Sequence, residues 1–235
     1  LKTVQECVPG APDDCLPATT LGWQSATAGH GSAVAGNTVA AGVMALDING
    51  DGYEDLAWAS AGTWRYMLGG ASGSSSVVNT TVAATNPGRA TPLEWNGDGF
   101  EDLLIDWSDG KWRVLTGSAT GLSTSSVQAG SGAGISSNVA NTTWTVADAN
   151  GDGRDDLLSM TVVDPNLTIK VHLAGSAGFG APTVAYSSNW LGKGGFASFT
   201  WPNAASATRQ PDFNGDERED LVINACTEFE YDGPY

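Results

Sequence analysis

Four short stretches of the chain concentrate oxygen-bearing side chains at a fixed spacing. The first, DINGDGYEDL, contains Asp47, Asn49, Asp51 and Asp55 within nine residues. Oxygen side chains at loop positions 1, 3 and 5, with a backbone carbonyl at position 7, are how a short loop binds a calcium ion. Tyr53 would supply the carbonyl, and Asp55 at position 9 would complete the shell directly or through water. For a single stretch, an Asx-rich turn is the alternative interpretation.

The same template recurs three times, which makes a chance turn a poor explanation. The further predicted ligands are Glu94, Asn96, Asp98, Phe100 and Asp102, then Asp148, Asn150, Asp152, Arg154 and Asp156, then Asp212, Asn214, Asp216, Arg218 and Asp220. An EF-hand would need a bidentate Glu at position 12. The residues at position 12 are Trp58, Ile105, Ser159 and Ile223. The loops at 47–55, 94–102, 148–156 and 212–220 therefore predict up to four structural calcium ions, none of them in an EF-hand.

Two of the loops depart from the template. Glu94 replaces Asp at position 1 of the second loop, and its extra methylene is expected to shift that ligand or weaken the site. Glu217 stands at position 6 of the fourth loop, where the others have glycine. If position 6 needs a positive φ, a side chain there costs roughly 1 kcal/mol. We therefore expect the first and third loops to be the best formed. At position 7 the type of side chain is expected not to matter for the metal.

The charge of the chain agrees with a cation-binding protein. The chain contains ten Lys and Arg residues and 26 Asp and Glu residues, which gives a formal charge of −16. Three acidic residues in each loop account for twelve of the 26. Four calcium ions would halve the net charge to about −8. Nucleic-acid binding draws on Lys and Arg against phosphates, and the basic residues here form no cluster, so no nucleic-acid partner is expected.

Each loop lies inside a larger repeating unit. A strand-like run such as TTWTVA precedes the loop, and an apolar run such as DLLIDW follows it. A shared phrase comes next, at 64–73, 112–121 and 169–178, and a looser segment closes the unit. The loop starts lie 47, 54 and 64 residues apart, close to the repeat of about 40 to 50 residues in a propeller blade. The pattern predicts an all-β protein, a β-propeller of about four blades or part of a larger ring. The calcium loops would join the first two strands of each blade.

The predicted repeats occupy residues 31–235 and follow an opening segment at 1–30. That segment contains a turn flanked by Cys7 and Cys15 and a candidate strand for closing the ring. The two cysteines form a disulfide in an oxidising compartment, or they remain reduced in an arm. Cys226 is expected to be a buried apolar residue. The chain begins at Leu1, so we expect it to be part of a longer polypeptide. It has no run of eighteen apolar residues, and no membrane span is expected.

The repeated D-x-N-G-D-G-x-x-D-L, over roughly residues 38–235, resembles the FG-GAP or VCBS repeat. This repeat occurs in integrin α-subunit propellers and in many bacterial surface and secreted proteins. The opening CLPAT, ahead of Trp23, resembles the segment before the FG-GAP region of SpvB-type, Tc-toxin B-component and RHS-repeat proteins. These resemblances imply a bacterial protein that is secreted or on the cell surface. They also imply a propeller within a toxin-like protein, which binds another toxin component or another domain of the same polypeptide.

Few residues suit catalysis, and we expect no enzymatic activity. His30 lies in a Gly/Ala-rich stretch. His172 occupies the repeat position of Met67 and Thr116, so it is expected to be a blade residue first. The close acidic pairs already belong to the predicted calcium loops. The sequence therefore favours a protein-binding or assembly module over an enzyme.

The nine tryptophans suggest a carbohydrate-binding, lectin-like propeller as the alternative. Trp64 and Trp112 share one repeat position, which Ile169 fills in the third copy, so packing between blades is their expected role. The remaining candidates for stacking on sugars are Trp58, Trp107, Trp190 and Trp201. A lectin should present equivalent aromatic pockets in every blade, and these residues do not recur in phase. A glycan partner therefore stays second to a protein partner.

Overall fold

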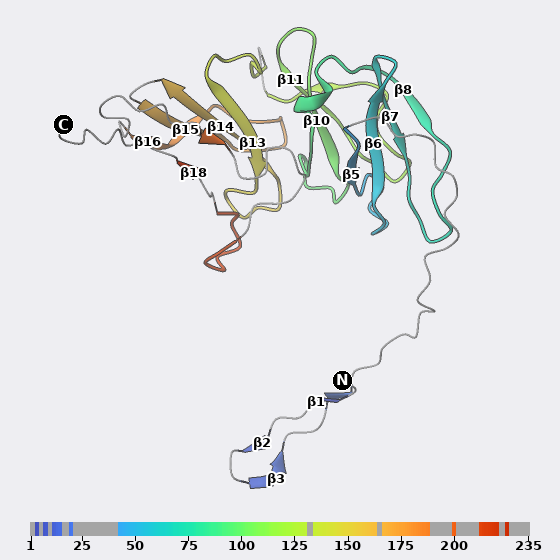
Figure 1. Cartoon of the computed structure of the whole chain (residues 1–235), viewed down its shortest axis with the longest axis vertical. Coiled ribbons are helices and arrows are strands. Elements are labelled where there is room, and N and C mark those ends of the chain that lie inside the picture. Colours follow the sequence, from blue (N-terminus) through green and yellow to red (C-terminus); the bar gives the residue numbers. More distant parts are fainter. Residues whose placement is uncertain are drawn as a thin grey trace, which may run out of the picture. The chain divides into compact units, whose positions relative to one another are not determined.

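The structure is a computed structural model that describes residues 42–130, 134–163, 166–188 and 212–220, and the backbone of six short strands elsewhere. The chain divides into two units, Leu1–Thr38 and Val39–Tyr235. The second unit contains three four-stranded antiparallel sheets, whose strands are labelled in Figure 1. All of the loops predicted to bind calcium belong to this second unit.

Each four-stranded sheet is an up-and-down meander in which the strands follow chain order. The first sheet comprises β5 (Met44–Leu46), β6 (Asp55–Ser60), β7 (Thr63–Met67) and β8 (Val78–Ala83). The second comprises β9 (Thr91–Leu93), β10 (Asp102–Asp106), β11 (Trp112–Leu115) and β12 (Val127–Gln128). The third comprises β13 (Thr142–Ala147), β14 (Asp156–Val163), β15 (Asn166–His172) and β16 (Thr183–Ser188). Four strands per copy, with the loop between the first two, are thus confirmed for three copies.

Shorter elements complete the described structure. A 3-10 helix, η1 (Pro87–Arg89), connects the first two sheets. In the fourth copy, β17 (Phe199–Thr200) pairs with β18 (Asn224–Ala225), so that strands flank the fourth loop on both sides. Closure of the sheets into a ring stays a prediction.

The opening segment contains two short ladders. In it, β1 (Thr3–Val4) pairs with β4 (Thr19–Thr20), and β2 (Cys7–Val8) pairs with β3 (Ala11–Cys15). The register of the second ladder places Cys7 opposite Cys15. Paired residues in an antiparallel ladder have Cα atoms about 4.5 to 5.5 Å apart, a separation that a disulfide can span. Their sulfur atoms lie outside the described residues, as do His30 and Cys226, so the predictions made for these residues stay open.

The second sheet packs on both of its faces. All five residues of β10 are buried. Leu103 and Ile105 pack into a core shared with the first sheet, whereas Leu104 packs into a core shared with the third. Successive side chains of a strand point to opposite faces, so a strand covered on both sides needs a continuous apolar run. The run DLLID therefore lies between two sheets, and its acidic ends meet the loops.

The two in-phase tryptophans fill the spaces between sheets. Trp64 is 1% exposed in the core that includes Leu115 of the second sheet, and Trp112 is 2% exposed in the core that includes Leu157 of the third. Ile169, at the same repeat position, lies in the core of the third sheet. These contacts confirm the packing role expected from their spacing.

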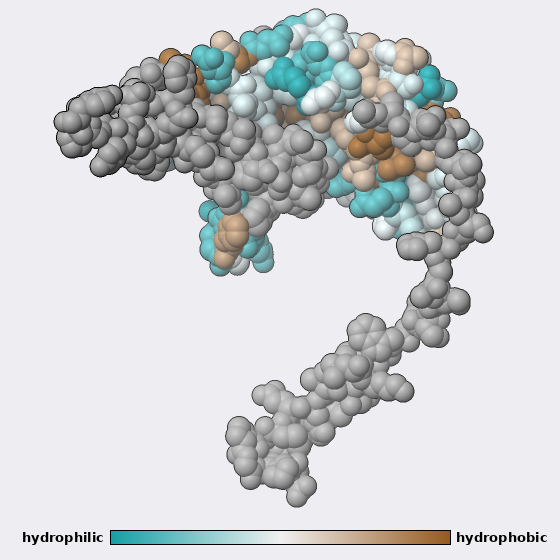
Figure 2. Space-filling view, viewed as in Figure 1, coloured by the Kyte–Doolittle hydropathy of each residue, from teal (hydrophilic) through white to brown (hydrophobic). Residues whose placement is uncertain are grey.

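On the surface, hydrophilic and weakly polar residues cover much of the described part of the visible face. Hydrophobic residues gather over the sheet of β5–β8 (Figure 2). Among the described residues, no helix is long and apolar enough to cross a membrane.

Candidate metal sites

The four loops share one backbone conformation, which local hydrogen bonds maintain. At position 3, the Asn49 side-chain oxygen accepts the Asp51 N–H at 3.1 Å. At position 5, Asp51 Oδ1 accepts the Tyr53 N–H at 2.9 Å. At position 1, Asp47 Oδ2 accepts the Gly52 N–H at 2.9 Å. The same three bonds recur in the other loops with donor–acceptor distances of 2.8 to 3.1 Å. The side chains at positions 1, 3 and 5 therefore all turn inward over the loop backbone.

In the first three loops, the Asp at position 9 is buried and ties the loop to its sheet, whereas Asp220 of the fourth loop is half-buried and accepts the Phe213 N–H at 2.7 Å. Asp102 Oδ2 accepts the N–H of Trp95 at position 2, at 3.0 Å, and Asp102 Oδ1 accepts the N–H of Gly117, which follows β11, at 2.7 Å. Asp55 and Asp156 make the equivalent pairs of bonds. All three side chains are fully buried. Each carboxylate oxygen keeps a second lone pair, so this residue type serves as an anchor and can still act as a metal ligand.

These buried carboxylates carry charge that the described protein does not neutralise. Between described residues, the carboxylates at positions 1, 5 and 9 have one ion pair, Arg154 with Asp152 at 3.8 Å. Burial, with a smaller contribution from the neighbouring acids of the loop, raises the pKa of Asp102 to about 7 and that of Asp156 to about 6. The pKa of Asp55 is raised for the same reasons. A buried carboxylate needs a compensating positive charge, which a proton or a bound cation can supply.

The donor set fits a calcium ion. Calcium prefers carboxylate, amide and carbonyl oxygens, and the loops present these types at positions 1, 3, 5, 7 and 9. In the first loop Asp47, Asn49, Asp51, Asp55 and the Tyr53 carbonyl would hold the ion. Among the described residues, no three His, Cys, Asp or Glu side chains already converge at metal-ligand spacing. There are two reasons for this. The Asn at position 3 is not one of these four residue types, and the carboxylate at position 9, such as that of Asp55, accepts backbone N–H groups. The structure brings all twenty predicted residues together in four loops, and their role as ligands stays a prediction.

The second loop accommodates its longer side chain. Glu94 Oε1 accepts the Gly97 N–H at 2.7 Å, and Oε2 accepts the Gly99 N–H at 2.9 Å. Asp148 makes the matching bonds to Gly151 and Gly153, at 2.8 and 2.9 Å. The extra methylene of Glu94 therefore leaves the carboxylate on the same backbone amides.

The fourth loop contains the backbone strain that its sequence predicted. Glu217 has φ of +66°, and the equivalent glycines Gly52, Gly99 and Gly153 have φ of +80° to +82°. Position 6 thus requires the left-handed region, which costs a residue with a side chain about 1 kcal/mol.

Replacing this residue should stabilise the protein. We expect Glu217→Gly to raise the free energy of unfolding by about 1 kcal/mol, because glycine adopts the left-handed region without a Cβ clash. Glu217→Ala is the matched control, since it removes the charge but keeps the clash. Urea unfolding at fixed calcium concentration measures both variants, and an equal gain in the two would assign the effect to charge.

Consecutive loops are joined by a repeated contact that we call the loop clasp. It consists of two hydrogen bonds between position 8 of one loop and position 1 of the preceding loop. Glu101 N–H donates to the Asp47 carbonyl at 3.0 Å, and Asp47 N–H donates to Glu101 Oε2 at 2.6 Å. The equivalent pairs are Asp155 with Glu94, both bonds at 2.6 Å, and Glu219 with Asp148, at 2.9 and 3.1 Å. Three clasps therefore join the four loops in chain order.

Position 7 contributes its side chain to the same junction. The Phe100 ring lies so close to Gly50 that a Cβ built on this glycine would be only 3.0 Å from the ring. The Arg154 side chain lies equally close to Gly97, where a built Cβ would be 2.9 Å from Nε. Arg154 Nε also donates to the Asn96 carbonyl at 3.1 Å. From the sequence, position 7 was predicted to contribute only its carbonyl, and no role was predicted for position 8. The recurring acid at Glu54, Glu101, Asp155 and Glu219 was the available signal.

The raised pKa values predict how the metal-free protein responds to pH. An unfolded Asp has a pKa of about 3.9, so between about pH 4 and 7 the folded protein binds more protons than the unfolded chain. Stability is then highest at the acid end of this window and falls as pH rises. We expect the denaturation midpoint in metal-stripped buffer to be higher at pH 5 than at pH 8.

A pair of variants tests whether the buried Asp residues of the loops cause this pH dependence of stability. Asp102→Asn should flatten the pH dependence, whereas Asp109→Asn, at an exposed position outside the loops, should not. Metal-free stability that rises from pH 5 to pH 8 would contradict the prediction. Added calcium should reverse the trend, because protons compete with the ion for the same carboxylates.

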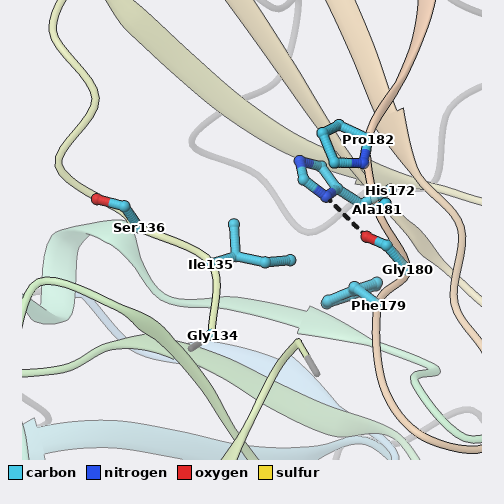
Figure 3. Close-up of a pocket in the computed structure, with 8 residues that line it drawn as sticks. All are labelled: Gly134, Ile135, Ser136, His172, Phe179, Gly180, Ala181 and Pro182. Atoms are coloured by element: carbon cyan, nitrogen blue, oxygen red, sulfur yellow. Dashed lines mark hydrogen bonds between the residues drawn. The ribbon is translucent and has the colours of Figure 1, made fainter. Parts of the chain in front are cut away.

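A shallow pocket of about 390 Å³ adjoins the third sheet, and among its described lining residues Ser136 and His172 have polar side chains. Its walls include Ile135, Phe179, Pro182 and His172 (Figure 3). His172 Nδ1 donates to the Gly180 carbonyl at 3.0 Å, and its ring lies 6.1 Å from that of Trp144. Burial lowers the pKa of this histidine. His172 is thus a packed residue of the sheet, as its repeat position predicted.

Two of the four tryptophans considered for sugar stacking are described. Trp58 is 7% exposed. The ring of Trp107 carries the Arg113 guanidinium at 4.9 Å from its centroid. Trp107 is also half-buried against the core of the first two sheets, so Arg113 and this core take up the surface that a sugar would need. Trp190 and Trp201 lie outside the described residues.

A comparison with known protein families agrees with the repeat. The FG-GAP-like repeat family matches residues 47–105, which span the first two loops. No curated protein matches. Among solved structures, the chain is similar to one in the Photorhabdus luminescens Tc holotoxin pore, with 19% identity and a TM-score of 0.39. The match covers 61% of this chain and 7% of that one. The family match therefore places an FG-GAP-like repeat at residues 47–105 of this chain.

Proposed function

We propose that the chain is a calcium-stabilised β-sheet repeat module that binds or assembles with another protein. The observation that carries the calcium proposal is the set of buried loop carboxylates with too few cationic partners. Calcium would neutralise this charge, and it would hold the inward-facing side chains at positions 1, 3 and 5. A loop so held would in turn fix the strands on both sides, because the position-9 Asp bonds to the turn after the third strand.

Calorimetric titration of two neighbouring variants tests the assignment of ligands. Asp51→Ala should remove one binding site, because it deletes a ligand carboxylate. Tyr53→Ala should keep the full stoichiometry, because position 7 would coordinate through its carbonyl and its side chain is 47% exposed. Equal losses in the two variants would show that the ligand positions are wrongly assigned.

The binding role rests on different grounds. Three sheets that share buried cores make a preorganised surface, which lowers the entropic cost of association. The CLPAT segment resembles toxin proteins, so the partner we favour is another component of a secreted toxin-like system or another domain of the same polypeptide. A glycan partner gains no support from Trp58 or Trp107.

The sequence of the full-length gene product would distinguish a protein partner in a toxin-like system from a glycan partner. An RHS/YD-repeat shell encoded next to these repeats, together with binding of this module to that shell, would support the assembly role. A cellulase, a lyase or a cell-wall anchor in its place, or selective micromolar binding of a glycan by the purified chain, would replace that role with carbohydrate recognition.

A further inference from the structure

The predicted ligand at position 1 of a loop is held in place by the loop that follows it in the chain. In the first clasp, the Asp47 N–H and the Asp47 carbonyl both bond to Glu101, at 2.6 and 3.0 Å. Because these two bonds lie on either side of the Asp47 Cα atom, they fix the direction in which its side chain leaves the backbone. The Asp47 carboxylate is thereby held where it accepts the N–H groups of Asp51 and Gly52, at 3.1 and 2.9 Å.

Glu101 itself lies between two predicted ligands of its own loop. The Phe100 carbonyl precedes it at position 7, and Asp102 follows it at position 9. Asp102 is fully buried, and its two oxygens accept the N–H groups of Trp95 and Gly117. Any change that orders positions 7 to 9 of the second loop therefore also places Glu101 against the first loop.

The contact repeats in the same direction along the chain. Asp155 bonds to Glu94 and Glu219 bonds to Asp148, in each case from position 8 of one loop to position 1 of the loop before it. In the second clasp, Asp155 is 5% exposed and Glu94 is 7% exposed. Hydrogen bonds to a carboxylate are shorter and stronger than those between neutral groups, and the Glu94 N–H lies 2.6 Å from Asp155. The clasp is thus a regular part of the repeat, and it is buried at one junction.

We propose that the position-8 acid of a loop is a positioning residue for the calcium site of the loop before it, and that consecutive calcium sites are coupled through the clasps. This inference rests on the calcium binding proposed above. Glu101 orients the Asp47 carboxylate, and an occupied second loop holds Glu101 through the residues on either side of it. The coupling acts in both directions, because a change in affinity that one site imposes on another is reciprocal.

The charge of the position-8 acid is a competing source of the same effect. An outer-shell partner of a metal ligand typically changes metal affinity by about 10- to 100-fold when it is mutated. An exposed charge near a site contributes less, because water and salt screen it. Glu54 separates the two sources, since it stands at position 8 of the first loop itself. It is exposed, and its carboxylate accepts no hydrogen bond from another described residue.

Calcium titration of the whole chain, followed by the NMR signals of single amides, tests the positioning role. The amides of Gly52, Gly99 and Gly153 bond to the position-1 carboxylates of the first, second and third loops, so they report on these loops separately. We expect Glu101→Ala to weaken calcium binding at Gly52 by about tenfold, because the Asp47 carboxylate loses its outer-shell support. Binding at Gly99, in the loop that contains Glu101, should change by less than about threefold.

Two further variants assign the effect to the hydrogen bond. Glu101→Gln keeps an oxygen that can accept the Asp47 N–H, so binding at Gly52 should return to within about threefold of the original protein. Glu54→Ala, the matched control, should change binding at Gly52 by less than about twofold. Equal losses for Glu101→Ala and Glu54→Ala, or for Glu101→Ala and Glu101→Gln, would overturn the positioning role in favour of charge. A loss at Gly99 that exceeds the loss at Gly52 would overturn it too.

A double-mutant cycle measures the coupling between the first two sites. Asp98→Asn lowers the charge of the second loop, which then fills only at higher calcium, and it leaves Glu101 in place. It should weaken calcium binding at Gly52 by about fivefold, a coupling of ordinary size. In the Glu101→Ala background the same substitution should have no further effect at Gly52, because the contact that links the loops is already lost. Additive losses would overturn coupling through the clasp.

Hydrogen exchange in chelator separates this inference from the calcium proposal. Glu101→Ala should speed exchange at Asp51 and Gly52, whose amides bond to Asp47, by at least about threefold through easier local opening, and it should leave Gly153 unchanged. Unchanged exchange at Asp51 and Gly52 overturns the positioning role whether or not calcium binds. An original protein whose reporter amides do not respond to calcium overturns the calcium proposal and the coupling together. One that binds calcium independently in each loop overturns the coupling alone.

Discussion

Calcium is expected to raise the melting temperature of this protein by about 5 to 10 °C for each occupied loop. A ligand at one hundred times its dissociation constant stabilises the folded state by about 2.7 kcal/mol. For a domain of about this length, each kcal/mol shifts the midpoint by about 2 to 4 °C. The physical source is the relief of repulsion among the three carboxylates of each loop, two of which are buried in the second and third loops. Thermal unfolding in calcium and in chelator measures the difference.

Two variants test whether the calcium-dependent rise in melting temperature comes from the loops. Asp148→Ala removes the position-1 ligand of the third loop, so it should abolish one loop's share of the calcium-dependent gain. Asp109→Ala removes an exposed acid outside the loops and should leave the gain intact. A melting curve that is the same in calcium and in chelator would contradict the calcium proposal, and an equal loss in both variants would contradict its placement.

Trp112→Ala is expected to lower the free energy of unfolding by about 4 kcal/mol, since truncation of a buried Trp typically costs 3 to 5 kcal/mol. The side chain is 2% exposed and packs in the core that joins the second and third sheets. Trp144 meets it edge to face, with ring centroids 5.9 Å apart, and the Arg89 guanidinium lies 5.0 Å from its ring. Removing it leaves a cavity between two sheets, which neither sheet can close alone.

Urea unfolding measures this loss, and an exposed aromatic residue provides the control. Tyr186 on β16 is 42% exposed, so Tyr186→Ala should change stability by less than about 1 kcal/mol. Because Trp112 lies on β11, outside the predicted calcium loops, the loss should be the same in calcium and in chelator. A loss for Trp112→Ala below 1 kcal/mol would mean that the sheets do not depend on this contact.

Local pattern was enough to predict the strands and loops. The run DLLIDW predicted the second strand of its sheet, and the structure places β10 there. Buried strands have a continuous apolar run, and a loop of fixed spacing needs glycines at fixed positions, so both leave a mark in consecutive residues. The strain at Glu217 was predicted in the same way, because one missing glycine stands out against three aligned copies.

What the sequence alone determined is therefore the repeat: four loops with oxygen-bearing side chains at positions 1, 3, 5 and 9, and strands on either side of them. The tertiary structure decided how the copies contact one another. Glu101 lies 54 residues from Asp47 in the chain, so no local pattern could indicate that its carboxylate accepts the Asp47 N–H. The same holds for Phe100, whose ring covers Gly50. Position 9 looked like a ligand only, and folding made it an anchor as well, because a buried carboxylate must satisfy its oxygens with whichever amides the packed sheet brings to it.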